Sequence, residues 1–429
     1  MKTSPSIALS NQERDWMAGK DGPAMQLAIN TVLQAAAIMG AERLVPATFA
    51  HLDACFYAGQ AHIDFARLLL DHGARFAVPA WTNNGLVSLE QPELRAGEAD
   101  ADTIAGAREL MHLYIKIGAR PVWTCAPYQL PDRPALGDHI IVGESNAVSF
   151  YNAVIGARTN KYGDFLDVAC ALTGKVPLAR LHTDEGRAGQ IVLDTSAVPD
   201  KLKSGDIFFH LMGHVMGQKA GSLIPVIEGL PESTSEDNLK AISAAGAAAG
   251  GVELWHGVGI TPEAATLDGA LQGKSPAAQI AITVDDLAQA RNQLSSGTDG
   301  PLNMVALGTP HFSLTEFAEL APLLAGRKVH QDVKVYVTTS RFIRDLAAAQ
   351  GHIAPLEAAG VDIITDTCTY FSPAVRGCTG RAMTNAAKWA YYAPGMLGIE
   401  VCFGSLAECA ESAVAGEVWR DHDIWRSLQ

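Results

Sequence analysis

The sequence predicts an α/β fold in which largely parallel sheets are flanked by helices, arranged in at least two α/β lobes. The clearest evidence is that short apolar runs alternate with helical segments over the C-terminal part of the chain. Five of these runs are expected to be buried strands: residues 279–284, 303–307, 333–337, 361–364 and 399–403. Strands separated by helices form βαβ units, which build parallel sheets covered on both faces. A second observation is that 48% of the 429 residues are apolar, enough for more than one core.

The first half of the chain shows the same alternation less regularly. A helix is expected over residues 24–39, entered through Asp21, Gly22 and Pro23, and another over residues 99–117, where acidic residues suit the positive end of the helix. Strands are expected at residues 43–49, 74–78, 121–124 and 139–142.

The middle of the chain is less regular, and a helix over residues 201–221 would use Gly213 and Gly217 for close packing. We therefore expect three parts. They are an N-terminal α/β lobe (1–175) with the Cys125 loop, a middle segment (176–275), and a C-terminal doubly wound lobe (276–429) with Cys368 and Cys409.

Composition excludes several classes of protein. The formal net charge of -14 argues against nucleic-acid binding, which requires basic patches. No apolar run is long enough to span a membrane, and the N-terminus lacks the apolar core of a secretion signal, so a cytoplasmic protein is expected. The seven cysteines are scattered and odd in number, which does not suit a disulfide framework.

Residues 361–409 are the most informative stretch of the chain. The strand at residues 361–364 ends just before Asp366 and Cys368, and chemistry in open α/β sheets lies beyond the carboxyl ends of strands. A helix over residues 384–392 carries Lys388. The strand at residues 399–403 leads into a helix that Ser405 is expected to cap and that carries Cys409.

Cys125, Cys368 and Cys409 all follow strands or begin helices. Three thiolates at such positions suit an iron–sulfur cluster, zinc or copper(I). However, the sequence has no CxxC motif, and free cysteine is more often simply buried. Burial fits Cys55, Cys170 and Cys402 better still, and Cys378 is left undecided.

Other polar residues at strand ends are candidates for catalysis or substrate binding, each with a structural alternative. Lys161, Lys388 and His311 could transfer protons, although Lys388 could instead anchor a carboxylate or face solvent. Arg341 could clamp a carboxylate through two bonds or lie on the surface. The remaining candidates could bind substrate or could form turns and caps: His51, Asp53, Thr82, Asn83, Ser145, Asn146 and Asn160.

The sequence lacks the P-loop, G-x-S-x-G and H-E-x-x-H motifs. In contrast, several segments together resemble the large, catalytic subunit of the aconitase X family. They are WTCAPYQ (123–129), GESNAVSFYNAVIGARTNKYGDF (143–165), DTC (366–368), TNAAKWAYY (384–392) and FGSLAEC (403–409), with GPAM (22–25) and AHLD (50–53). The resemblance covers nearly the whole chain.

The resemblance implies an aconitase-like fold and a hydro-lyase activity. It also implies that three cysteines hold an iron–sulfur cluster or a single iron ion; these match Cys125, Cys368 and Cys409, with Cys402 competing for the third place. The family pairs this subunit with a small swivelling domain that contributes a serine. The chain ends at Gln429, so we expect that domain to be a separate polypeptide.

Two reactions are known for the family. One dehydrates cis-3-hydroxy-L-proline to Δ1-pyrroline-2-carboxylate, and the other dehydrates mevalonate 5-phosphate. The TNAAKWAYYAPGMLG segment is similar to the hydroxyproline type.

The expected mechanism uses iron as a Lewis acid, because the α-proton is weakly acidic and hydroxide is a poor leaving group. Arg341 or Lys388 would anchor the carboxylate, and Ser145, Asn146 and Asn160 would hydrogen-bond substrate. The base would be the partner's serine or Lys161. Two alternatives remain: a non-catalytic scaffold subunit, and a metal-independent lyase with Lys388 or Lys161 as base.

Overall fold

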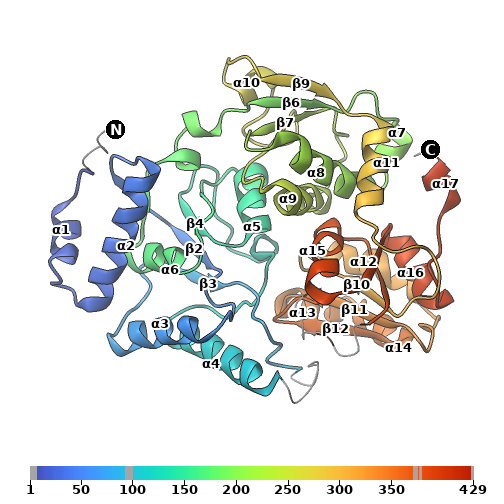
Figure 1. The fold of residues 1–429 in the computed structure, drawn as a ribbon, viewed down its shortest axis with the longest axis horizontal. Helices are drawn as coiled ribbons and strands as arrows, with labels where there is room; N and C mark the ends of the chain where they lie inside the picture. The colour runs from blue at the N-terminus through green and yellow to red at the C-terminus, as the bar shows by residue number, and fades with distance from the viewer. Residues whose placement is uncertain (1–6, 92–99, 371–374, 376–378, 427–429) are drawn as a thin grey trace.

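The fold is α/β, as the sequence predicts, and its larger sheets are all parallel. The structure is a computed structural model that describes residues 7–91, 100–370, 375 and 379–426. Strand order is β12-β11-β10-β13-β14 in the largest sheet, β8-β7-β6-β9 in the second and β3-β2-β4 in the third. Among the strands that the structure describes, only β1 and β5, a separate pair, run antiparallel. Figure 1 shows the chain passing through these sheets in turn, from the N-terminal region at the left to the largest sheet at the lower right.

The first region is organised around the three-stranded sheet. Its elements are α1 (Asn11–Met17), α2 (Pro23–Met39), β1 (Leu44–Pro46), β2 (Phe49–Leu52), α3 (Gln60–Asp71), β3 (Ala80–Thr82), α4 (Ala101–Ile117), β4 (Ile140–Val142), α5 (Ser145–Phe150), α6 (Leu166–Thr173) and β5 (Lys175–Pro177).

The second region contains the four-stranded sheet. Its elements are β6 (Ile191–Asp194), α7 (Asp200–Lys203), α8 (Asp206–Ala220), β7 (Pro225–Glu228), α9 (Glu236–Gly250), β8 (His256–Gly257), α10 (Leu267–Leu271), β9 (Ala278–Ala281) and α11 (Val284–Gln293). The strand expected at residues 279–284 is β9, and it pairs with β6 rather than with the C-terminal sheet.

The third region contains the five-stranded sheet. Its elements are β10 (Met304–Leu307), α12 (Leu314–Leu324), β11 (Lys334–Thr339), α13 (Arg341–Ala349), α14 (Ile353–Ala359), β12 (Val361–Thr365), β13 (Arg381–Thr384), α15 (Ala387–Leu397), β14 (Glu400–Phe403), α16 (Leu406–Ala415) and α17 (His422–Arg426). Ser405 caps α16 in a reciprocal arrangement with Glu408, as expected.

Several expectations about local structure are wrong. The strand expected at residues 43–49 is divided between β1 and β2, which lie in different sheets. Residues 121–124 form a loop instead of a strand, with Trp123 at a positive φ of 43°, and the strand expected at residues 74–78 begins later, at Ala80. Thr384 ends strand β13 instead of beginning the helix of Lys388. In each case the apolar run is short, so its own pattern does not show which segment finds a pairing partner.

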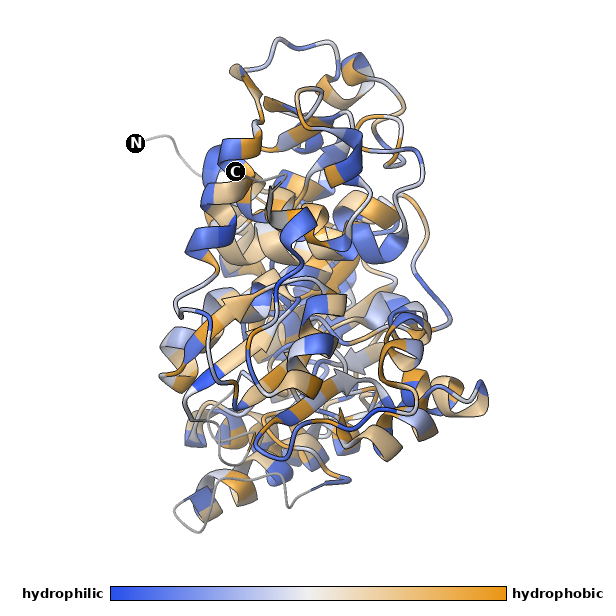
Figure 2. Ribbon diagram, turned by 90° about the vertical axis from the view of Figure 1, so that its right-hand side faces the viewer, coloured by the Kyte–Doolittle hydropathy of each residue, from blue (hydrophilic) through white to orange (hydrophobic). Residues whose placement is uncertain are grey.

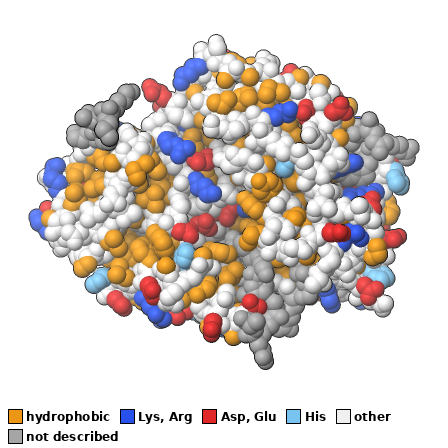
Figure 3. All heavy atoms as spheres, in the orientation of Figure 1, with side chains coloured by type: hydrophobic (Ala, Val, Ile, Leu, Met, Phe, Trp, Pro, Cys, Tyr) orange, Lys and Arg blue, Asp and Glu red, His pale blue; other side chains and the backbone are white. Residues whose placement is uncertain are grey.

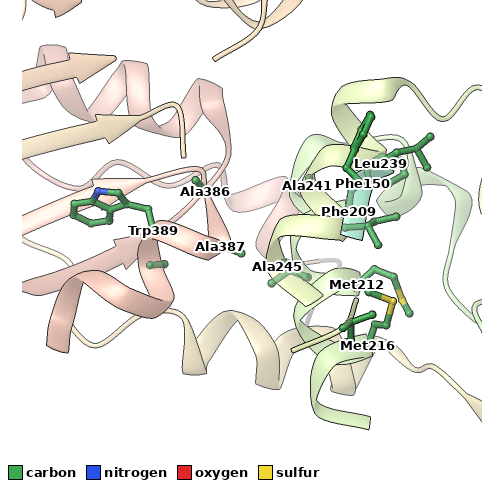
Figure 4. Close-up of a cluster of buried hydrophobic side chains, with 14 of the residues drawn as sticks. Phe150, Phe209, Met212, Met216, Leu239, Ala241, Ala245, Ala386, Ala387 and Trp389 are labelled. Atoms are coloured by element: carbon green, nitrogen blue, oxygen red, sulfur yellow. The ribbon is translucent and has the colours of Figure 1, made fainter. Parts of the chain in front are cut away.

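Helices α8 and α9 pack closely through glycine. A side-chain carbon added at Gly213 would lie 2.5 Å from the carbonyl oxygen of Ile242, and one added at Gly250 would lie 2.0 Å from that of Gly217. The pair joins a large apolar cluster that reaches α5 and α15. Figure 4 shows this cluster, with Met212 and Met216 of α8 on one side and Trp389 of α15 on the other. The cluster therefore fixes the position of the helix that carries Lys388.

Hydrophilic residues lie mainly on the outer helix turns and in the loops, as Figure 2 shows. On the face in Figure 3, cationic side chains are scattered between acidic and apolar ones, as expected for an acidic chain. In the part of the chain that the structure describes, no helix has the length and apolar character needed to cross a membrane.

Candidate active site

Two cysteines from distant parts of the chain meet in the interior. The Sγ atoms of Cys125 and Cys368 lie 3.9 Å apart, and both residues are almost fully buried. Cys368 follows β12, as the sequence predicts. Cys125 lies in the loop after α4, and the hydroxyl of Thr82 accepts hydrogen bonds from Val122 and Trp123 in this loop. Thr82, a predicted site residue at the end of β3, thus positions the loop that carries Cys125.

His311 lies beside the two cysteines. Its backbone N–H donates to the Sγ of Cys125 at 3.4 Å, and its ring bonds to the hydroxyl of Thr124 and the carbonyl oxygen of Thr367. Ligand atoms of Cys125, His311 and Cys368 all lie within 4.8 Å of one another. This is a compact group of two thiols and one imidazole.

The surroundings favour one thiolate and a neutral imidazole. Burial by itself would raise the pKa of Cys125, but the hydrogen bond from Cys368 and the charge of Lys388 lower it below the usual value. The same hydrogen bond and burial raise the pKa of Cys368 well above its usual range. Burial lowers the pKa of His311 to about 4, so its ring is neutral at pH 7. Thiolate and neutral imidazole are the forms that bind metals.

Lys388 forms a buried ion pair with Glu144 next to the cysteines. Burial alone would raise the pKa of Glu144, but Lys388 lowers it to about 2. Burial would likewise lower the pKa of Lys388, yet the charges of Glu144 and Cys125 raise it above the ordinary value. Lys388 therefore keeps its proton.

Glu144 also occupies the turn where we expected Ser145 and Asn146 to hydrogen-bond substrate. Its side chain caps α5 by accepting from the backbone of Asn146, and it accepts from the side chains of Ser145 and Asn146 as well. Tyr128 donates to the side-chain oxygen of Asn146. Ser145 and Asn146 thus bind Glu144, and through it they position Lys388.

A small pocket of about 190 Å³ opens beside this ion pair. It is lined by Asp53, Phe56, Asn83, Asn84, Glu144, Asp164 and Tyr370. Asn83 donates to the carboxylates of Asp53 and Glu144 at 2.5 Å and 3.2 Å. Burial and the charge of Glu144 raise the pKa of Asp53 to about 7. The predicted residues Asp53 and Asn83 therefore lie together at a pocket, and the ion pair connects that pocket to the cysteines.

Comparison with known proteins identifies the family. Models of the first, second and third domains of aconitase X match residues 6–185, 189–292 and 302–415. The chain belongs to the aconitase X family.

Its relatives in the aconitase X family are dehydratases. The chain is 42% identical to a cis-3-hydroxy-L-proline dehydratase of Pseudomonas aeruginosa over 96% of its own length and 70% of the relative. It is 33% identical to the phosphomevalonate dehydratase large subunit of Thermococcus kodakarensis over 90% of its length and 94% of the relative. A crystal structure of Thermococcus kodakaraensis aconitase X in its holo-form matches with a TM-score of 0.83 and 29% identity, covering 95% of this chain and all of that one.

The structure does not bring every predicted site residue to the group of Cys125, His311 and Cys368 or to the adjoining pocket. Cys409 lies with Cys402 in a separate apolar cluster around the five-stranded sheet, because α16 packs its cysteine inward against that sheet. Among the described residues, His311 lies beside Cys125 and Cys368, and Cys409 does not. The spacing of cysteines along the chain carries no information about which residues meet in the fold.

Lys161 and Asn160 also lie away from the centre. Lys161 is exposed, and its backbone N–H bonds to Glu253. The buried side chain of Asn160 donates a hydrogen bond to the carbonyl oxygen of Ala179 and accepts one from the backbone N–H of Leu181. These residues hold the loop that precedes α6 and do not line the pocket.

Arg341 and His51 have structural partners. Arg341 makes two bonds of 2.7 Å to Asp366, so its two-point geometry is directed at a protein carboxylate. The ring of His51 bonds to the carbonyl oxygen of Thr124 at 2.8 Å, which helps to hold the loop before Cys125.

Several residues of the site were missed as candidates, among them Thr124, Glu144, Asn84 and Tyr370. Glu144 lies inside a segment that the family resemblance already marked, directly after a strand. Glutamate is not among the residues preferred at the capping position before a helix, so no local pattern marked its side chain.

Proposed function

We propose that the chain is the large subunit of a hydro-lyase that dehydrates cis-3-hydroxy-L-proline to Δ1-pyrroline-2-carboxylate, together with a separate small swivelling subunit. The observation that carries the choice of substrate is the charge of the pocket. The described residues that line it include three carboxylates, Asp53, Glu144 and Asp164, and no cation. Lys388 pairs with Glu144, and Asp164 is exposed. The Asp53 carboxyl is therefore the one available to an ammonium group, and no cation among the described lining residues would attract a phosphate.

The donor set fits an iron centre. Cys125, Cys368 and His311 would hold the metal, since thiolate and imidazole are both iron ligands. An iron–sulfur cluster and a single iron ion both suit these donors. When bound, the metal would act as a Lewis acid that polarises the substrate's oxygen atoms. In this proposal His311 takes the place expected for Cys409, and acts as a ligand rather than as a proton shuttle.

Lys388 supplies positive charge to the site. Because Glu144 and the thiolate of Cys125 keep it protonated, it stabilises negative charge and cannot act as the base. Loss of the α-proton from the substrate places negative charge on the carboxylate, and a fixed ammonium favours that state. Since Lys161 is exposed, we assign the base to the serine of the small subunit.

The second candidate substrate is mevalonate 5-phosphate, favoured by relatives such as the Thermococcus kodakarensis large subunit. It requires a cationic phosphate site, which the described pocket residues do not provide.

The test is to purify the chain anaerobically with a candidate small subunit, measure iron and sulfide, and assay both substrates. We expect bound iron and turnover of cis-3-hydroxy-L-proline. Bound iron with turnover of mevalonate 5-phosphate, but not of cis-3-hydroxy-L-proline, would instead make mevalonate 5-phosphate the substrate. A well-folded complex with neither iron nor turnover would instead support a scaffold subunit, and turnover that survives chelation would support a metal-independent lyase.

A further inference from the structure

Two amide side chains at the pocket have buried atoms without a hydrogen-bond partner among the described residues. They are the Oδ1 of Asn83 and the Nδ2 of Asn84, and both residues are 2% exposed. A buried polar atom without a partner costs about 1–3 kcal/mol. Because both residues line the same pocket, a bound molecule that satisfies both atoms is the simplest explanation.

The orientation of the Asn83 amide follows from its neighbours. Its Nδ2 donates to the carboxylates of Asp53 and Glu144, which accept but do not donate when ionised. The Oδ1 must therefore point away from them, and it is available only as an acceptor. The pocket thus offers an acceptor from Asn83 and a carboxylate from Asp53, with an N–H donor from Asn84.

We propose that Asp53 and the Oδ1 of Asn83 bind the ammonium group of a cyclic amino acid, while the side-chain N–H of Asn84 donates to its carboxylate. This proposal rests on the proposed function and names the residues that would select an amino acid over a carboxylic acid of the same shape. The high pKa of Asp53 agrees with it, because a cation placed beside this carboxyl would favour the ionised form.

The dimensions of the pocket agree with a small ligand. Its volume of about 190 Å³ is below the range of roughly 300–1,000 Å³ that is usual for drug-sized ligands. Glu144 is already neutralised by Lys388, and Asp164 is partly exposed and lies 3.1 Å from His62. Asp53 is therefore the carboxylate best placed to bind a substrate cation.

The test compares L-proline with cyclopentanecarboxylate, which has the same ring size and carboxylate but lacks the amine. Binding is measured by calorimetry on the anaerobically purified complex, so that turnover is not needed. We expect the wild-type complex to bind L-proline at least about tenfold more tightly than cyclopentanecarboxylate, and this ratio of affinities is the quantity compared between variants. Asp53→Asn should reduce this ratio to about twofold or less without weakening cyclopentanecarboxylate. It should also raise KM for cis-3-hydroxy-L-proline more than it lowers kcat.

Asn84→Ala should weaken both probes by a similar factor, because it removes a donor to the carboxylate that they share. The matched control is Asp164→Asn, which removes a carboxylate from the same pocket and should leave the ratio within about twofold of wild type. An equal effect of Asp53→Asn and Asp164→Asn would overturn the proposal, since the preference would then come from the general field of the pocket.

The outcomes separate this proposal from the proposed function. The complex could turn over cis-3-hydroxy-L-proline while Asp53→Asn leaves the ratio of affinities for L-proline and cyclopentanecarboxylate unchanged. That result would overturn the subsite and leave the proposed function standing. A ratio that depends on Asp53, without turnover, would support the subsite and count against the function. A wild-type complex that binds neither probe would overturn the subsite.

Discussion

At the scale of single residues, the six cysteines that the structure describes have different environments. The Sγ atoms of Cys125 and Cys368 lie 3.9 Å apart beside His311 and Lys388, whereas Cys409 is surrounded by apolar residues of another cluster. Burial raises the pKa of Cys409 well above its usual range, so it remains a thiol. The position of a cysteine relative to cations and other ligands thus decides whether it can bind a metal.

Cys368→Ser should remove most of the bound metal and the activity of the complex, because one of two thiol ligands is lost. We expect metal affinity to fall by at least about tenfold. Metal analysis after anaerobic purification measures the effect, and the unfolding midpoint checks the fold. Cys409→Ser is the matched control, since it also replaces a buried cysteine but should retain metal. Metal loss in Cys409→Ser together with retention in Cys368→Ser would contradict the assignment.

Lys388→Met should lower the free energy of unfolding by roughly 3–5 kcal/mol, because it leaves the buried charge of Glu144 without its partner. The double variant Lys388→Met with Glu144→Gln should recover much of this stability, but it should not recover activity. Urea unfolding of the three proteins measures the coupling. If the double variant were no more stable than Lys388→Met, the ion pair would not be the source of the loss.

At the scale of elements, the helices are placed by packing that brings reactive groups together. The N-terminal end of α15, with Lys388, lies against the α8–α9 pair, and the loops after β10 and β12 converge because parallel strands end at one edge of the sheet. The close approach of α8 and α9 requires glycine where the two backbones meet.

Gly213→Ala should destabilise the protein by about 1–3 kcal/mol, because the new methyl group would lie 2.5 Å from a backbone oxygen of α9. Gly395→Ala in α15 is the control. It makes the same substitution inside a helix but has no neighbouring atom within 4 Å, so the better helix propensity of alanine should stabilise it by up to about 1 kcal/mol. Thermal unfolding compares the two. A Gly213→Ala protein as stable as Gly395→Ala would show that the helices can move apart at little cost.

At the scale of the whole molecule, the candidate site forms where the first and third regions meet. Cys125 comes from the first region, and His311 and Cys368 come from the third. Glu90 of the first region forms ion pairs with Arg341 and Arg344 of α13, and Asp366 accepts from the backbone of Leu89. These bonds hold the two regions together close to the cysteines.

The pH dependence of stability is a sum of opposing buried groups. Burial lowers the pKa of His182 to about 3, so the unfolded state binds more protons below pH 6.5 and stability falls with acid. Burial raises the pKa of Asp167 to about 8, so the folded state binds more protons between pH 4 and 8 and stability falls as the pH rises. The total response therefore does not isolate either group.

A comparison at two pH values isolates His182. His182→Gln should be less stable than wild type at pH 7.5, because Tyr162 and His139 lose a bonding partner. At pH 5 the gap should shrink by roughly 2 kcal/mol, since only the wild type then has an imidazole that unfolding would allow to bind a proton. Urea unfolding of both proteins at the two pH values gives this difference. A gap that stays constant or widens would show that the histidine is not held neutral.

The sequence by itself determined the α/β class and the family, and it named Cys125, Cys368, His311 and Lys388 among its candidates. Apolar runs that alternate with helices are local patterns, and Cys125 and Cys368 lie within motifs that can be read along the chain. Only the tertiary structure brought His311 beside the two cysteines and Cys409 into another cluster, paired Glu144 with Lys388, and paired Arg341 with Asp366. These contacts join residues far apart in sequence, and their partners are chosen by strand order and helix packing, which no local pattern encodes.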